Sequence, residues 1–170
     1  TGPATRIEGF TITGGSEFDG GAVKVQSSRA TLRDCRFVDC QGGTGGAVNL
    51  AFAGGTTIED CVFLGNFTPP VIDPFFIQGG ALYVSGNSGT HPPVRVRRCT
   101  FQGNTAGDGG AVHSNGVVPV FVSHCIFRDN GALRWGGAIQ NRSWNPGVFT
   151  LDDCLLVGNT AGDDGGAVYS

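Results

Sequence analysis

The sequence contains no methionine and few charged residues, and both shortages narrow the kind of protein it can be. Charged residues make up 15% of the chain, whereas soluble domains usually hold about a quarter. Glycine, by contrast, occurs 30 times, which is typical of folds with many tight turns and closely approaching backbones. This composition argues against a helical protein.

The charge balance gives no sign of an anionic partner. The net charge is -3 and the pI is near 5.4, so we expect no nucleic-acid partner and no anionic membrane surface. No apolar run is long enough to span a membrane, and no signal peptide opens the chain. Because the sequence begins at Thr1 and not at methionine, we expect a mature product or an excerpt of a longer protein.

Two short motifs alternate along the whole chain. The first is an aliphatic residue, two polar residues and then Cys-x-Phe-x-x-Asn, with a degenerate first copy from Ile7 to Gly15. The second is Gly-Gly-Ala followed by an aliphatic residue, with its alanines at Ala22, Ala47, Ala81, Ala111, Ala138 and Ala167. Self-similarity at such a period is the signature of a stacked repeat fold.

The spacing of apolar residues within the motifs predicts strands. Apolar and polar residues alternate, as in Val23-Lys24-Val25, and no ten-residue stretch carries the helical period. Short strands joined by Gly, Asn and Pro turns are typical of a β-solenoid. We therefore predict an all-β, right-handed parallel β-helix of about six coils, a single-stranded, pectin-lyase-like architecture that forms one domain over residues 1–170.

Like positions of consecutive coils should stack into ladders, one strand spacing of roughly 4.8 Å apart. Cysteine and phenylalanine are expected inside, because buried cysteine behaves as a small apolar residue. Asparagine is expected at a turn, where its amide can bridge to the coils on either side. The expected ladders are Cys35, Cys61, Cys99, Cys125 and Cys154; Phe37, Phe63, Phe101 and Phe127; and Asn66, Asn104, Asn130 and Asn159. The Gly-Gly pair should supply positive-φ residues, and replacing its second glycine should cost more than an ordinary surface substitution.

These motifs resemble the repeats of the polymorphic outer-membrane protein family and of related bacterial surface β-helices. The matches are FLGN at 63–66, FQGN at 101–104 and FRDN at 127–130, each with a Gly-Gly-Ala partner. The similarity covers essentially the whole chain, although Cys40 replaces one asparagine and Leu156 one phenylalanine. The resemblance implies the passenger region of an autotransported adhesin, displayed on a bacterial surface.

The residues that are expected to face outward do not form a catalytic arrangement. The column that follows the second motif is expected to face outward and holds no carboxylate pair of the kind that hydrolyses glycosides; it comprises Lys24, Asn49, Tyr83, His113, Gln140 and Tyr169. Asp34 and Asp60 should lie one coil apart beside the cysteine ladder, where a solvated face is favoured over a cation site.

Metal binding is not expected either. Asp19, Asp108 and Asp164 precede the Gly-Gly pair in non-adjacent coils, which favours capping of a turn over calcium binding. The three histidines fall at different coil positions, and the cysteines lack CxxC spacing. We expect no metal and no cofactor.

The repeat is interrupted where coils three and five carry longer turns. Coil three inserts residues 67–78 with Phe75 and Phe76, and coil five adds Trp135 and Trp144. Exposed aromatics of this kind often mark a contact surface for protein or carbohydrate. The alternative, that the insert folds back and covers its own coil, stays open.

The sequence thus favours a structural protein over an enzyme. We expect a secreted or cell-surface structural or adhesive solenoid, either an adhesin passenger segment or a self-assembling filament subunit. Its partners would be other copies of itself, through end-to-end or lateral contacts, or a host or cell-surface protein or glycan. The alternative is a carbohydrate-active β-helix enzyme, a lyase or hydrolase, with catalytic groups around Asp73 in the insert.

Overall fold

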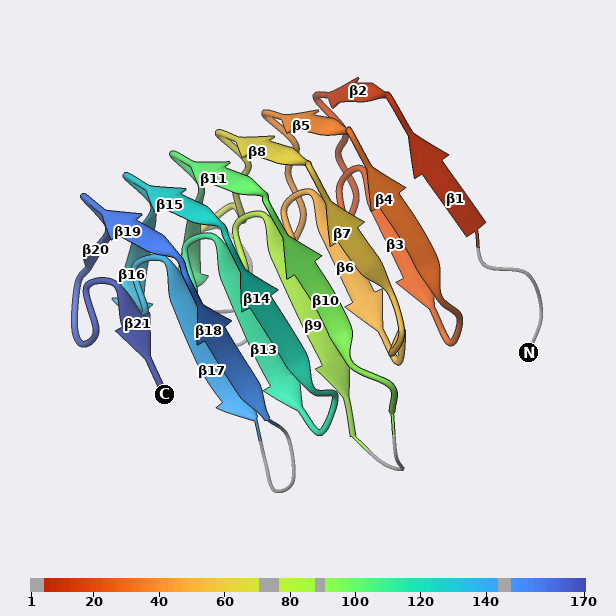
Figure 1. Ribbon diagram of the computed structural model, residues 1–170. Coiled ribbons are helices and arrows are strands. Elements are labelled where there is room, and N and C mark those ends of the chain that lie inside the picture. Colours follow the sequence, from red (N-terminus) through yellow and green to blue (C-terminus); the bar gives the residue numbers. More distant parts are fainter. Residues whose placement is uncertain (1–4, 71–76, 88–90, 144–147) are drawn as a thin grey trace.

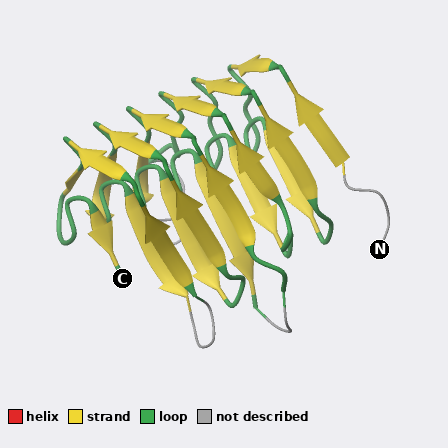
Figure 2. Cartoon of the chain, viewed as in Figure 1, coloured by secondary structure: helices red, strands yellow, loops and turns green. Residues whose placement is uncertain are grey.

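The fold is a stack of coils, each of which contributes one strand to each of three long parallel sheets (Figure 1). The computed structural model describes residues 5–70, 77–87, 91–143 and 148–170. Every regular element in these ranges is a β-strand, and every pairing between coils is parallel (Figure 2). The predicted β-solenoid of about six coils is therefore confirmed.

Sheets A and B are joined by a bend at the residue that precedes each ladder cysteine, where φ is positive, as in Asp60 at 55°. Sheet A comprises β1 (Thr5–Glu8), β4 (Ala30–Arg33), β7 (Thr57–Glu59), β10 (Val94–Arg97), β14 (Val120–Ser123) and β18 (Phe149–Asp152). Sheet B comprises β2 (Thr11–Thr13), β5 (Arg36–Val38), β8 (Val62–Leu64), β11 (Thr100–Gln102), β15 (Ile126–Arg128) and β19 (Leu155–Val157).

Sheet D lies opposite and follows the Gly-Gly-Ala motif, while the short sheet C precedes that motif. Sheet D comprises β3 (Val23–Gln26), β6 (Val48–Ala51), β9 (Leu82–Gly86), β13 (Val112–Gly116), β17 (Ile139–Ser143) and β21 (Val168–Tyr169). Sheet C comprises β12 (Thr105–Asp108), β16 (Gly131–Trp135) and β20 (Thr160–Ala161).

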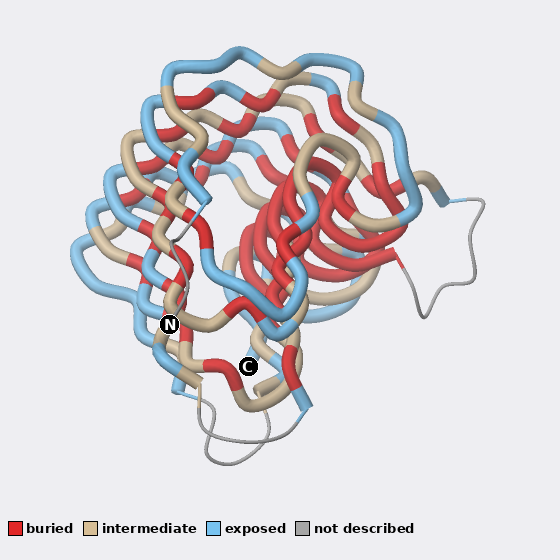
Figure 3. Tube along the Cα trace, turned by 90° about the vertical axis from the view of Figure 1, so that its right-hand side faces the viewer, coloured by how far each residue is buried: buried red, intermediate tan, exposed pale blue. Residues whose placement is uncertain are grey.

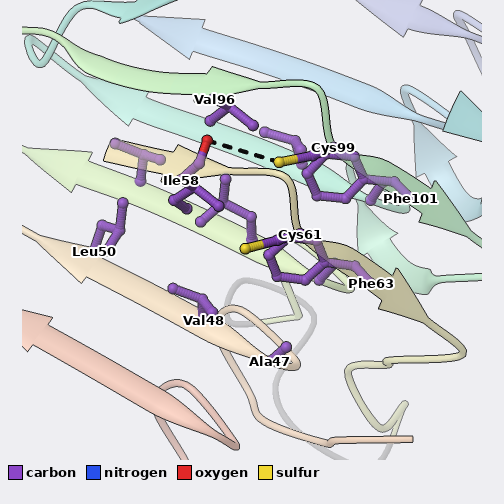
Figure 4. Close-up of a cluster of buried hydrophobic side chains, with 14 of the residues drawn as sticks. Ala47, Val48, Leu50, Ile58, Cys61, Phe63, Val96, Cys99 and Phe101 are labelled. Atoms are coloured by element: carbon purple, nitrogen blue, oxygen red, sulfur yellow. Dashed lines mark hydrogen bonds between the residues drawn. The ribbon is translucent and has the colours of Figure 1, made fainter. Parts of the chain in front are cut away.

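The core consists of side chains that point inward from sheets A, B and D. Strand β10 shows the alternation directly, because its valines are buried while its arginines are exposed. Figure 4 shows Ile58 and Val96 of sheet A facing the interior beside Cys61 and Cys99, with Leu50 of sheet D. A narrow interior lined in this way removes nearly all of the inward apolar surface of the middle coils from water.

The three ladders run through this interior at the spacing of the coils. The rings of Phe37, Phe63, Phe101 and Phe127 stack with centroid separations of 4.9, 4.7 and 4.8 Å. The cysteine thiols are free, and four of the five in the ladder are fully buried. The thiol of Cys99, for example, donates to the carbonyl of Arg97 at 3.2 Å and of Ile58 at 3.7 Å.

The asparagine ladder satisfies the turn between sheet B and the segment that follows it. The backbone N–H and the Nδ2 of Asn66 both donate to Oδ1 of Asn104, at 3.0 and 2.9 Å. The same pair of bonds recurs from Asn104 to Asn130 and from Asn130 to Asn159. At the start of the ladder the backbone N–H of Cys40 donates to Oδ1 of Asn66. Cys40 has no amide oxygen of its own, so the column of amide acceptors ends there.

The two glycines of each Gly-Gly pair are required for different reasons, which corrects one expectation. The positive φ belongs to the first glycine, as in Gly45 at 68°. The second glycine needs space, because a Cβ on Gly46 would collide with the carbonyl oxygen of Gly80 in the next coil. Close stacking of successive turns therefore excludes a side chain at the second position wherever another coil follows.

Candidate functional site

Three of the six residues in the column predicted to face outward from sheet D are covered, which corrects the sequence interpretation at these positions. Asn49, His113 and Gln140 do point away from the core but are buried, with exposures of 3%, 0% and 0%. The segment before the Gly-Gly pair lies over them: Nδ2 of Asn49 donates to Oγ1 of Thr44 at 2.7 Å. Figure 3 shows the resulting band of buried chain across successive coils.

This burial changes the electrostatics of one histidine. His113 stacks on Tyr83 of the neighbouring coil, with ring centroids 5.6 Å apart. Burial disfavours the imidazolium, and together with the nearby positive charge of Arg142 it lowers the pKa of His113 to about 3. His113 is therefore a neutral spacer between two layers of backbone over most of the pH range. It has no access to solvent and so is not placed to exchange protons with a substrate.

The covering segment carries the acidic residues that precede the Gly-Gly pair. Asp108 is completely buried and accepts two hydrogen bonds from the guanidinium of Arg134, at 2.9 and 2.7 Å. Asp19 accepts from Thr44 of the next coil at 2.7 Å and from Lys24 at 2.8 Å. Both carboxylates are thus engaged in contacts between coils, and the described residues contain no cluster of three groups able to hold a metal ion.

The carboxylates beside the cysteine ladder are also paired. Asp60 accepts from Nε of Arg98 at 2.8 Å, and Glu59 accepts from Arg97 at 2.7 Å. These hydrogen bonds from arginine lower the pKa of both carboxyl groups. Asp34 lies 3.5 Å from Nε of Arg33. The cations that neutralise this face are therefore arginines of the same sheet.

One of the four predicted contact aromatics can be placed. Trp135 is half-buried, stacks on Tyr169 at 5.9 Å and lies under the guanidinium of Arg134 at 4.9 Å. Trp135 therefore packs against the neighbouring last coil, where Tyr169 stays exposed. Phe75, Phe76 and Trp144 lie outside the described residues, as does Asp73.

A groove that the sequence analysis missed lies on the outer face of sheet D, beyond the edge of the covering segment. This sheet D groove has a volume of about 300 Å³. It is lined by Phe52, Tyr83, Ser85, Gly86, Asn87, Asn115, Gly116 and Val117. Two features of the sequence could have indicated it, namely the glycines that end β9 and β13 and the phenylalanine that follows β6.

The two end coils expose apolar side chains at positions that inner coils bury. Leu151 is 36% exposed, whereas its register partner Val122 is 1% exposed. Val168 is 40% exposed, whereas its partner Ile139 is fully buried. At the other end, Phe10 occupies the cysteine position of the first coil and is 59% exposed. Both ends thus present an apolar cross-section and a row of strand edges (Figure 1).

Comparison with known proteins supports the fold alone. A family model described as "right handed beta helix region" matches residues 2–162. No curated protein and no solved structure matches the sequence. None of the described residues forms a helix long and apolar enough to cross a membrane.

Proposed function

Because the chain belongs to the right-handed β-helix family, we propose that it is a structural and adhesive solenoid of the cell surface or extracellular space. The observation that carries this proposal is that the buried and paired polar residues join one coil to the next. Asn66, Asp108 and Glu59 each hold one coil to the next through hydrogen bonds or ion pairs. These polar groups of the described coils thus make the stack of coils rigid, and a rod that displays a binding surface requires such rigidity.

The exposed ends give this rod its means of extension. An end coil offers unpaired strand edges beside exposed Leu151 and Val168, and a further coil would cover both. That coil can come from the same polypeptide, in an adhesin passenger segment, or from another copy, in a filament. Head-to-tail contacts between copies do not close on themselves and so generate an open polymer.

The state of the cysteines is compatible with the proposed extracellular location. Four cysteines of the ladder and Cys40 are buried and free, and their thiols donate to backbone carbonyls. A thiol held in this way is shielded from oxidants, because disulfide exchange requires an accessible thiolate. Such a chain can persist in an oxidising compartment without forming disulfides.

The proposal is tested by assembly and attachment assays on the 170-residue chain. We expect rods that lengthen by end-to-end contacts in negative-stain micrographs, and adhesion of these rods to host cells or glycan-coated surfaces. Leu151→Lys should shorten the rods, whereas Thr150→Lys, on the outward face of the same strand, should leave them unchanged. Cleavage of polygalacturonate that is abolished by Asp73→Ala would instead support the carbohydrate-active enzyme.

A further inference from the structure

The sheet D groove has a flat floor made of glycine backbone. Gly86 ends β9 and Gly116 ends β13, and the two are register partners in adjacent coils. A Cβ on Gly116 would collide with the carbonyl oxygen of Gly86, and one on Gly86 would lie 2.6 Å from Cγ2 of Val118. A side chain is excluded at both positions, at Gly86 by the buried Val118 and at Gly116 by the backbone of Gly86, so both residues contribute only backbone to the lining.

One wall of the groove is an aromatic side chain held in an unfavourable backbone conformation. Phe52 has a φ of 53°, and its equivalent in the first coil is Ser27, at 50°. A bulky residue in this region costs of order 1–3 kcal/mol. Phe52 is also 40% exposed, so the hydrophobic core recovers little of that cost. Because Ser27 has the same φ, the turn of the coil sets this conformation, and Phe52 uses it to place an exposed aromatic ring at the edge of the groove.

The opposite side of the groove supplies neutral hydrogen-bonding groups. Tyr83, Ser85 and Asn115 point outward from sheet D, and Nδ2 of Asn115 donates to the Tyr83 hydroxyl at 3.4 Å. Exposed Asn87 adds a second side-chain amide. None of the lining residues is charged. The lining therefore offers aromatic surface with amide and hydroxyl partners, and Arg142, the register partner of Asn115, lies in the next coil beyond it.

We propose that the sheet D groove binds a neutral pyranose unit of an oligosaccharide. A pyranose ring presents C–H groups on its face and hydroxyls around its rim, which match an aromatic wall beside amide groups. The volume of about 300 Å³ lies at the lower end of the range for small-ligand pockets, as suits one or two sugar rings. This inference deepens the adhesive function proposed above and rests on it for the role of the bound sugar.

Isothermal titration of the purified chain tests the assignment with four neutral probes: maltotriose, mannotriose, lactose and N-acetylchitotriose. We expect saturable binding of at least one probe, and no comparable binding of the charged probe trigalacturonate. Phe52→Ser introduces the residue type that the first coil has at the equivalent position, Ser27. The substitution removes the aromatic ring without removing a contact of the hydrophobic core. It should weaken the bound probe at least tenfold while the melting temperature stays equal or rises.

Phe121→Ser is the matched control, because Phe121 is 37% exposed but lies on the outer face of sheet A, away from the groove. It should leave sugar affinity unchanged. The inference is overturned if no neutral probe binds, if Phe52→Ser binds as tightly as the natural chain, or if trigalacturonate or a proline-rich peptide binds there in preference. Rod assembly and cell attachment that persist in the absence of sugar binding would refute this inference alone and leave the proposed function standing.

Discussion

Asn104 sits in the middle of the asparagine ladder, and its replacement by alanine removes four hydrogen bonds at once. Its Oδ1 accepts from the backbone and the side chain of Asn66, and its Nδ2 donates to Oδ1 of Asn130 and to the carbonyl of Phe63. The residue is fully buried, so water does not replace these partners. An orphaned buried N–H costs about 1–3 kcal/mol, and each further lost bond adds a smaller amount. We expect Asn104→Ala to lower the free energy of unfolding by about 2–5 kcal/mol.

Asn159 provides the matched comparison at the end of the same ladder. It accepts from the backbone and side chain of Asn130 and donates to Phe127, but it is only half-buried. Water can reach the groups it leaves, so Asn159→Ala should cost about 1–2 kcal/mol. Both variants are measured by urea unfolding followed by circular dichroism, with exposed Gln102→Ala as a further control. Equal losses for Asn104→Ala and Asn159→Ala would refute the argument that burial gives the ladder its strength.

Four further outcomes follow from the structure. Gly46→Ala should prevent or severely weaken folding, whereas Gly131→Ala should be tolerated because its Cβ would meet nothing closer than 3.7 Å; thermal unfolding distinguishes them. The low pKa of His113 means that the unfolded chain binds a proton between about pH 6.5 and pH 3 that the folded chain does not, so stability should fall as the pH drops through that window. His113→Gln should flatten this dependence in pH-resolved unfolding. Arg98→Ala should change the free energy of unfolding little, because the Arg98 side chain is half-exposed and water screens its ion pairs with Glu59 and Asp60, and a large loss would contradict this reasoning. Thiol titration without reductant should find six free cysteines after denaturation and few before it, and any shortfall after denaturation would indicate disulfides.

The fold could be predicted from the sequence because each ladder position acts through its own equivalents one coil away. Phe63 stacks on Phe37 and Phe101, and Asn66 forms hydrogen bonds with Asn104. A residue type that recurs at the same position of each coil therefore indicates that its copies contact one another. Alternation within the strands then fixes which face is inside. Neither inference requires knowledge of how the turns pack.

The outer face of sheet D could not be predicted in the same way. The alternation of apolar and polar residues correctly predicted that His113 points away from the core. The burial of its side chain, however, depends on where the segment before the Gly-Gly pair lies. That placement is set by contacts such as Thr44 with Asn49, which no periodicity encodes. The groove was missed for a related reason, because Phe52, Gly86 and Gly116 belong to three coils and meet only once the coils are stacked.

The central claim is that the chain is a structural rod whose ends recruit further coils, and the length distribution of the purified chain tests it most directly. Six coils stacked at roughly 4.8 Å make one copy about 29 Å long. Negative-stain microscopy should show rods of constant width whose lengths grow in steps of that size, and Leu151→Lys should reduce them to short forms. Uniform single particles of 17.5 kDa, unchanged by that substitution and at every concentration tested, would contradict the account.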